Sequence, residues 1–181
     1  MRITGGTLRS RKLRSIESAK LRPATDRLRE TMFNILANIL DLKGAAALDL
    51  YAGTGSVGFE TISRGAEKVV FVEADKKIAD ILKENSRALG VEEKCEIRVM
   101  KVEKFLKLCD EKFDIAYIDP PYAVNRTTDK IVDEILSRKI VNESGIICVE
   151  HSKDYSPPQS LLLRQKVFGS TFLSFIKPEE K

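Results

Sequence analysis

The stretch that decides the fold is residues 45–58, which read Ala-Ala-Ala-Leu-Asp49-Leu-Tyr-Ala-Gly53-Thr-Gly55-Ser-Val-Gly58. A short apolar run that ends in a glycine-rich turn predicts a buried strand over 45–50 and a helix beginning at Val57. The glycines permit a tight turn and a close backbone approach to a ligand, and the start of the helix offers unpaired N–H groups. The pattern therefore predicts a nucleotide-like ligand at the carboxyl end of this strand.

The next apolar run, 69–72, ends at Glu73, which falls 20 residues after Gly53. Nucleotide-binding folds place an acid at this spacing to accept hydrogen bonds from the ribose hydroxyls. The glycine spacing also matches the NAD fingerprint, which is weak information by itself. Asp49 favours a different ligand, because a carboxylate at the turn repels a pyrophosphate but attracts a sulfonium with an amino-acid tail.

A second motif, Asp119-Pro120-Pro121-Tyr122, follows the apolar run 113–118. Proline fixes φ and donates no backbone hydrogen, so this loop is stiff and its carbonyl groups remain able to accept. The Asp119 carboxylate and the Pro120 carbonyl form a rigid acceptor pair, and Tyr122 adds a flat ring. Such a group can hold a planar base by its exocyclic amino group. The tetrapeptide alone favours a plain proline-rich turn that closes a strand, and the glycine-rich motif upstream shifts the interpretation to base binding.

Together the glycine turn, Glu73 and the Asp119–Tyr122 loop resemble a class I S-adenosylmethionine methyltransferase that acts on an exocyclic amine. Two further segments, 2–13 and 21–34, extend the similarity; they read Arg2-Ile-Thr-Gly-Gly-Thr-Leu-Arg-Ser-Arg-Lys-Leu13 and Leu21-Arg-Pro-Ala-Thr-Asp-Arg-Leu-Arg-Glu-Thr-Met-Phe-Asn34. With these four motifs in order, nearly the whole chain resembles the bacterial RsmD-like family. That family transfers a methyl group to N2 of a guanine in small-subunit (16S) ribosomal RNA.

The resemblance implies a role for each matching residue. The cofactor S-adenosylmethionine would be bound by Asp49, Gly53, Gly55, Glu73 and Val102. The catalytic loop would comprise Asp119, Pro120 and Tyr122.

The chain departs from the family after the third strand. The family usually carries an Asp or Asn there that accepts from the adenine amino group, whereas this chain has Lys101, which can only donate. Adenine recognition would then fall to backbone groups near Lys101 and Val102, or to Glu103.

Charge is concentrated at the N-terminus. Residues 1–30 carry nine Lys or Arg against three acids, a net +6, which leaves −2 for the rest of a chain whose total is +4. This distribution favours a nucleic-acid partner over a merely solvated tail. We predict a basic extension over residues 1–24, flexible and adding little apolar material to the core, ahead of a catalytic domain over 25–181. The expected RNA-binding residues are Arg9, Arg11, Lys12, Arg14, Arg22 and Arg27.

The order of predicted elements indicates an α/β fold. The implied architecture is a Rossmann-like, mostly parallel seven-stranded sheet of the class I methyltransferase type, with a C-terminal antiparallel hairpin and an N-terminal basic extension. Strands are predicted at 45–50, 69–73, 95–99, 113–118, 144–150, 161–168 and 171–177. Helices are predicted at 26–40, 57–64, 76–89, 102–109 and 127–139.

Composition excludes several classes. There is no apolar stretch near the ~20 residues that span a bilayer and no secretory signal pattern, so a cytoplasmic location is expected.

Cys95, Cys109 and Cys148 have no zinc-type spacing and are expected to be reduced and mostly buried. His151 is the single histidine, which makes a His-based triad or metal cluster improbable, and it is expected at a surface or edge. No metal is predicted.

Alternatives remain. An adenine-N6 methyltransferase acting on DNA or RNA would use the same Asp119–Tyr122 chemistry, but such enzymes usually bring a target-recognition region for which 181 residues leave little room. A non-catalytic RNA-binding module is a second alternative, and a hydride-transfer enzyme a distant third. The expected partner is small-subunit ribosomal RNA, within a ribosomal subunit or an assembly intermediate.

Overall fold

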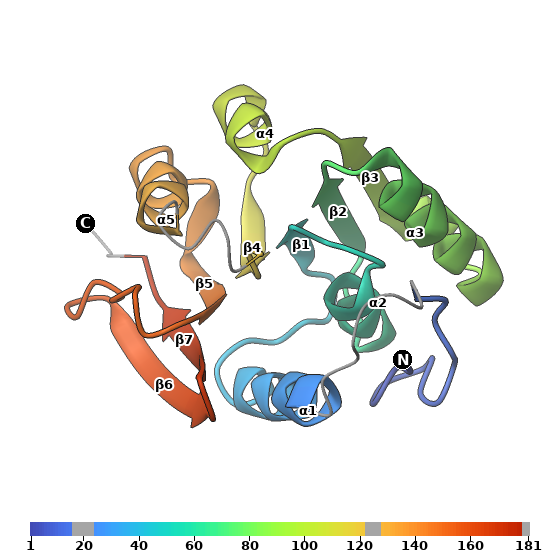
Figure 1. Cartoon of the computed structure of the whole chain (residues 1–181), viewed down its shortest axis with the longest axis horizontal. Helices are drawn as coiled ribbons and strands as arrows, with labels where there is room; N and C mark the ends of the chain where they lie inside the picture. Colours follow the sequence, from blue (N-terminus) through green and yellow to red (C-terminus); the bar gives the residue numbers. More distant parts are fainter. Residues whose placement is uncertain (16–23, 122–127, 179–181) are drawn as a thin grey trace.

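The computed structural model describes residues 1–15, 24–121 and 128–178. One seven-stranded sheet, ordered β3-β2-β1-β4-β5-β7-β6, forms the centre of the molecule (Figure 1). The strands are β1 Ala46–Leu50, β2 Lys68–Glu73, β3 Cys95–Val99, β4 Phe113–Ile118, β5 Val141–His151, β6 Leu162–Phe168 and β7 Thr171–Ile176. The helices are α1 Ala24–Leu36, α2 Ser56–Ser63, α3 Lys76–Leu89, η1 Glu92–Lys94, α4 Val102–Leu108 and α5 Thr128–Ser137.

Parallel pairing joins β1 to β2 and β4, β2 to β3, and β4 to β5, while β7 pairs antiparallel with both β5 and β6. The predicted class I methyltransferase architecture and its C-terminal hairpin are therefore confirmed. The central strands read as continuous apolar runs because helices cover both faces of the sheet. In β1, for example, residues 47–50 are buried and Ala46 is partly buried.

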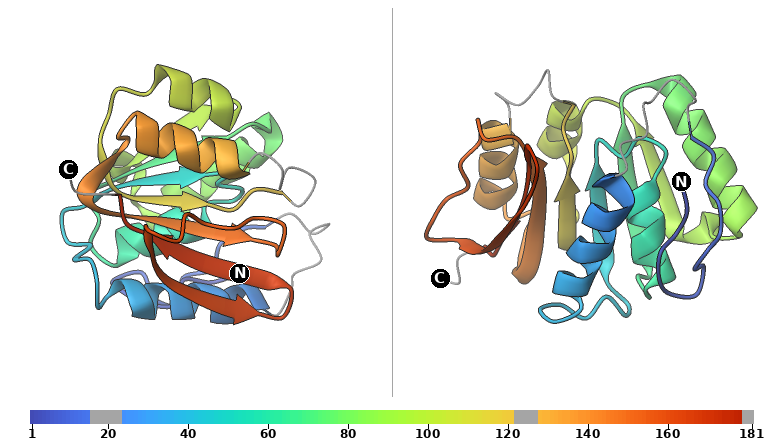
Figure 2. Two further views of the ribbon diagram at one scale, coloured as in Figure 1. Left: turned by 90° about the vertical axis from the view of Figure 1, so that its left-hand side faces the viewer. Right: turned by 60° about the horizontal axis from the view of Figure 1, so that its bottom comes forward.

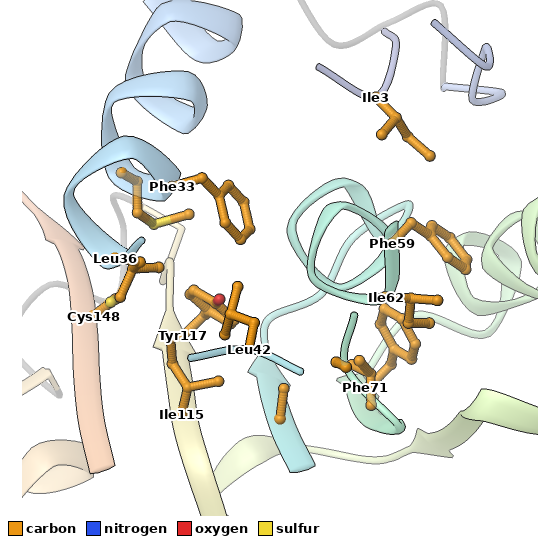
Figure 3. Close-up of a cluster of buried hydrophobic side chains, with 14 of the residues drawn as sticks. Ile3, Phe33, Leu36, Leu42, Phe59, Ile62, Phe71, Ile115, Tyr117 and Cys148 are labelled. Carbon is orange, nitrogen blue, oxygen red and sulfur yellow. The ribbon is translucent and has the colours of Figure 1, made fainter. Parts of the chain in front are cut away.

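Helices lie on both faces of the sheet (Figure 2). Two apolar layers hold them to it. One layer packs alternate strand residues against α1, α2 and α3, and the other packs the remaining strand residues against α4 and α5. Figure 3 shows part of the first layer, where Phe33 of α1 faces Tyr117 of β4 with ring centroids 6.1 Å apart. On the same layer Phe59 of α2 packs on Phe71 of β2 at 5.1 Å.

Most predicted elements lie within a few residues of their expected bounds. The first helix ends at Leu36, and not at 40 as predicted, because residues 37–40 close into tight turns that include an Ile39 N–H to Leu36 carbonyl bond of 2.9 Å. The fifth strand begins at Val141, earlier than predicted, and reaches its partner β4 through a register shift between Phe113 and Ile115. The short helix η1 was not predicted.

The prediction that the N-terminal extension is flexible and adds little to the core is wrong for residues 1–15, here called the arm. The arm folds back on itself, with Arg2 and Lys12 forming an antiparallel bridge. Ile3 and Leu13 are 1% and 5% exposed and belong to the same apolar cluster as the buried residues of α1 and α2 (Figure 3 shows Ile3). The division between residues 24 and 25 remains a prediction.

Buried Glu60 of α2 anchors the arm. Its carboxylate accepts from the Thr4 N–H and the Thr4 hydroxyl, both at 2.7 Å, and from Arg64 at 2.9 Å. Arg29 of α1 lies 3.6 Å from the same carboxylate and donates to the Arg2 carbonyl. Paired and hydrogen-bonded in this way, a fully buried carboxylate is tolerated, and it joins the arm, α1 and α2.

The prediction that His151 lies at a surface or edge is also wrong, since it is 4% exposed. Its two ring nitrogens lie 2.8 Å from the Ser174 hydroxyl and 2.7 Å from the Ser152 carbonyl. The ring stacks on Phe172, and burial lowers the pKa of His151. The cysteine prediction is confirmed, because Cys109 and Cys148 are buried, Cys95 is partly buried and all three are free thiols.

Candidate active site

Four acids stand in a row along one edge of the sheet. Glu73, Asp49, Asp119 and Glu150 lie at the carboxyl ends of the consecutive strands β2, β1, β4 and β5. Their side chains share the face that carries α1 and α2, because each follows a buried residue of that layer by two positions on its strand. Open α/β sheets bind ligands outside this edge, so the row defines the candidate site.

The turn after β1 has a backbone that most residues avoid. Tyr51, Gly53 and Gly55 all have positive φ, at 60°, 56° and 86°. Glycine adopts this left-handed conformation without steric strain, whereas for Tyr51 the Cβ makes it unfavourable in conformational energy. No atom lies within 4 Å of a Cβ built on Gly53, so the backbone there faces open space in which a ligand can approach.

Asp49 is the deepest acid of the row. Its register partners are Phe71 on β2 and Tyr117 on β4, which precede Glu73 and Asp119 by two residues. Asp49 is 4% exposed. Burial, reinforced by the charges of Asp119 and Glu73, raises the pKa of Asp49 to about 8, while a 2.9 Å hydrogen bond from the Gly58 N–H opposes the shift. A cation at this position would restore the ionised carboxylate.

Gly58 must lack a side chain for this arrangement to form. A Cβ built on it would lie 2.1 Å from the Phe71 ring and 3.0 Å from the Asp49 carboxylate. The third glycine of the fingerprint therefore lets α2 pack directly against β1 and β2.

Glu73 ties the glycine turn to the next helix. Its carboxylate accepts from the Gly53 N–H at 2.9 Å and from the Asp75 N–H at 2.8 Å. Asp75 in turn caps α3 by accepting from the Lys77 N–H at 2.8 Å. The predicted ribose-binding acid thus lies directly beside the predicted glycine turn.

Asp119 continues β4 and is exposed, whereas Pro120 is buried. Asp119 also lines a cavity between the sheet edge and α1. Leu28, Arg29 and Met32 of α1 line the opposite wall, and Asp49 and Glu150 lie on the same wall as Asp119. Tyr122 lies outside the described residues.

Val102 is the first residue of α4, three residues after the end of β3, and it is buried. Lys101 occupies the N-cap and makes no side-chain hydrogen bond there, so the first N–H groups of α4 are not capped by that side chain.

The basic residues of the arm are spread over its exposed side, where Arg9, Arg11, Lys12 and Arg14 all lie. Arg11 donates to the Ala88 carbonyl near the end of α3, and Arg14 pairs with Glu84. Arg27 is exposed on α1, and Arg22 lies outside the described residues.

Asn85 of α3 connects the arm to the glycine turn. Its side-chain amide donates to the Arg14 carbonyl at 3.1 Å and to the Thr54 carbonyl at 3.0 Å, and its oxygen accepts from the Arg14 N–H at 2.8 Å. Asn85 is 2% exposed. The basic arm and the predicted cofactor turn are therefore held together by one buried side chain.

Sequence reasoning missed Glu150, Glu60 and Asn85. A signal for Glu150 was present, because it follows the apolar run 146–149 as Glu73 follows 69–72. Glu60 and Asn85 lie within helices and carry no such signal.

Within the described residues, no group of three or more His, Cys, Asp or Glu side chains could hold a metal ion. None of the helices in these ranges is both long and apolar enough to cross a membrane.

Comparisons with known proteins agree with this geometry. The model of the family described as Conserved hypothetical protein 95 matches residues 1–177. Ribosomal RNA small subunit methyltransferase D of Haemophilus influenzae is 35% identical over 175 residues, covering 93% of this chain and 89% of the relative. The Escherichia coli protein of the same name is 36% identical over 178 residues, covering 93% and 85%.

Among solved structures, the Escherichia coli protein yhhF superposes with a TM-score of 0.88 at 29% identity, covering 100% of this chain and 99% of that one. The match of the family model and of these relatives extends over nearly the whole chain. The protein therefore belongs to the RsmD family, the family described as Conserved hypothetical protein 95.

Proposed function

We propose that this protein transfers a methyl group from S-adenosylmethionine to the exocyclic N2 amine of a guanine in small-subunit ribosomal RNA. The relatives that bear the name ribosomal RNA small subunit methyltransferase D support the general activity, methylation of ribosomal RNA. The guanine-N2 target and the cofactor are the finer part of the proposal. The observation that carries it is the row formed by Glu73, Asp49 and Asp119 on neighbouring strands.

The residues of the row fit this cofactor. Glu73 would accept from both ribose hydroxyls, and Asp49 would pair with the ammonium group of the methionine part, whose positive charge offsets the cost of ionising a buried carboxylate. The open space over Gly53 and the tight turn at Gly55 would allow the backbone to lie against the ligand. The backbone N–H of Val102, at the start of α4, would contact the adenine ring. When bound, the cofactor supplies an electrophilic methyl group on a sulfonium.

Asp119 and Pro120 would prepare the target amine. The N2 lone pair of guanine is delocalised into the ring, so the amine is a poor nucleophile. Two acceptors, the Asp119 carboxylate and the Pro120 carbonyl, would take its two hydrogens and turn the lone pair toward the methyl carbon. On methyl transfer the amine nitrogen would gain a positive charge, and it would then lose one proton on the side of Asp119. Such positioning can supply roughly 7–11 kcal/mol of the barrier reduction.

The target base would have to leave its stack to reach Asp119, because Asp119 lines a cavity between the sheet and α1. Tyr122 would offer a replacement stacking face, worth about 1–3 kcal/mol. Basic residues of the arm would bind RNA phosphates beside the site, since Asn85 joins Arg14 to the glycine turn. Small-subunit RNA within a ribosomal subunit or an assembly intermediate is the proposed substrate.

A direct test supplies methyl-labelled S-adenosylmethionine and small ribosomal subunits from cells that lack this protein, followed by nucleoside analysis of the RNA. The proposal expects label in N2-methylguanosine. Label in N6-methyladenosine, or in duplex DNA offered in parallel, would favour the adenine-N6 alternative. Saturable RNA binding without any transfer would favour a non-catalytic module.

A further inference from the structure

Glu150 is the fourth acid of the row, and the proposed function assigns it no role. Val149 pairs in register with Ile118, so Glu150 and Asp119 are the next pair along the parallel strands β5 and β4. Neighbouring strands lie about 4.8 Å apart, and both side chains point to the face that carries α1. The two carboxylates therefore lie on neighbouring strands, and both residues line one cavity.

The rest of the cavity around Glu150 is largely apolar. Leu28 and Met32 of α1 lie across from it, and Leu173, its register partner on β7, lies beside it. Glu150 itself is partly buried. Asp49, Asp119 and Arg29 line other parts of the same cavity. A carboxylate beside apolar side chains suits a flat ring that presents an N–H along its edge, because the ring faces contact carbon while the edge donates to the acid.

Guanine and adenine differ at this edge. Next to its exocyclic amine, guanine carries N1–H, which is a donor, whereas adenine carries N1 with a lone pair, which is an acceptor. A carboxylate only accepts hydrogen bonds, so it would bind the first and repel the second. With the amine held at Asp119, the neighbouring ring position would fall toward the neighbouring strand, where Glu150 stands.

We propose that Glu150 determines the base specificity of this enzyme by accepting a hydrogen bond from N1–H of the target guanine. This inference rests on the proposed function and adds to it the residue that excludes adenine. Glu150 would contact the base, while Asp119 and Pro120 hold the reacting amine. A site built to accept from an N–H rejects a base that lacks it more strongly than an apolar pocket rejects a base of different shape.

The test uses the full-length protein and 2-aminopurine, a base that keeps the N2 amine but has an acceptor at N1. The methylated position is first mapped with the wild-type protein, and small-subunit RNA is then assembled into subunits with guanine or 2-aminopurine at that position. Wild type should prefer guanine by about 100-fold or more in kcat/KM. In Glu150→Gln the side-chain amide can donate to N1 of 2-aminopurine, and the carboxylate that accepts from N1–H of guanine is gone. The rate with guanine should therefore fall, and the preference for guanine over 2-aminopurine should shrink by roughly tenfold or more.

Two controls separate specificity from folding. Glu143→Gln, an exposed glutamate near the start of the same strand, should leave the preference unchanged. Glu150→Gln should bind S-adenosylmethionine with wild-type affinity and unfold at the wild-type urea midpoint. 2-Aminopurine also lacks the O6 of guanine, but this difference is the same for wild type and for Glu150→Gln. The change in the guanine to 2-aminopurine ratio of kcat/KM between the two proteins therefore reports on Glu150.

Binding gives a second readout that needs no transfer. With S-adenosylhomocysteine present, subunits that carry 2-aminopurine should bind wild type more weakly than subunits that carry guanine, and Glu150→Gln should narrow the difference. If wild type forms N2-methylguanosine but accepts 2-aminopurine equally well, or if folded Glu150→Gln keeps the wild-type ratio, the role of Glu150 is overturned and the proposed function stands. If wild type forms no N2-methylguanosine, both are overturned.

Discussion

The backbone N–H of Gly53 donates to the Glu73 carboxylate across 2.9 Å, which joins the glycine turn after β1 to the acid at the end of β2. The two residues are 20 positions apart in the chain and come together because β1 and β2 are parallel neighbours in the sheet. The contact holds the Gly53 backbone, which faces open space, beside the carboxylate of the predicted cofactor site.

The first prediction concerns Glu73. Glu73→Ala should weaken S-adenosylmethionine binding by tenfold or more, because charge-assisted hydrogen bonds contribute about 1.5–3 kcal/mol. Titration calorimetry measures the loss, with the exposed Glu67→Ala as a matched control. Unchanged cofactor affinity in Glu73→Ala, or tight binding of NAD by wild type, would contradict the proposed cofactor site.

The second prediction uses the raised pKa of Asp49, about 8 in the ligand-free protein. At pH 7 most of the carboxyl groups carry a proton, and pairing with a cationic ligand requires the ionised form. Binding of S-adenosylmethionine at pH 7 should therefore release a proton, which calorimetry in buffers of different ionisation enthalpy detects. Release should disappear near pH 9 and in Asp49→Asn, whose affinity should also be much lower.

The same pKa sets the pH dependence of stability. Between the unfolded value near 3.8 and the folded value near 8, the folded state binds one more proton at Asp49 than the unfolded state does. This contribution to the free energy of unfolding therefore falls as pH rises through that window and is flat above it. Wild type should lose stability relative to Asp49→Asn between pH 4 and pH 8 in urea titrations. A constant difference across that range would contradict the raised pKa.

The third prediction concerns Gly58. Gly58→Ala should lower the free energy of unfolding by about 1–3 kcal/mol, because its Cβ would overlap the Phe71 ring. Phe71→Leu replaces the ring by a smaller side chain, which removes the overlapping ring atoms and costs stability by itself. The double variant should lose less than the two single losses combined, which urea unfolding of the four proteins tests. Additive losses would show that the overlap is relieved elsewhere.

Features that depend on residues close together in the sequence could be predicted, whereas features that depend on contacts between distant segments could not. The strands around Asp49, Glu73 and Asp119 were predictable because an apolar run followed by a polar residue is a local pattern, and parallel strands bring their carboxyl ends to one edge. The hairpin of β6 and β7 was predictable from its two-residue turn, Gly169-Ser170.

The misses arose from contacts between distant segments. Thr4 and Glu60 are 56 residues apart, so no local pattern showed that the arm packs on α2. His151 is buried because Ser174 and Phe172 of the following hairpin cover it. The arginines of the arm suggested a flexible, RNA-binding extension outside the core, whereas Ile3 and Leu13 between them are part of the apolar layer.

The fourth prediction concerns RNA binding by the arm. Because Ile3 and Leu13 are part of the core, deletion of the arm would disturb the fold, and charge-removing substitutions test the role more cleanly. Arg9→Ala with Lys12→Ala should weaken RNA binding and reduce the salt dependence, the slope of log K against log salt, by about 2. Cofactor affinity should not change.

Lys130→Ala on α5, in the opposite helix layer, provides the matched control. Filter binding of small-subunit RNA at several salt concentrations measures all three proteins. Equal slopes for the double variant and wild type would remove Arg9 and Lys12 from the RNA interface.

The most direct test of the central claim, that Asp119 positions an RNA amine for methyl transfer, is the single-turnover rate of Asp119→Ala on small ribosomal subunits, measured by N2-methylguanosine formation. The account predicts a loss of at least about 100-fold, with S-adenosylmethionine affinity near wild type and the exposed Asp110→Ala fully active. If Asp119→Ala keeps most of its single-turnover rate, Asp119 does not orient the amine and the proposed mechanism is wrong.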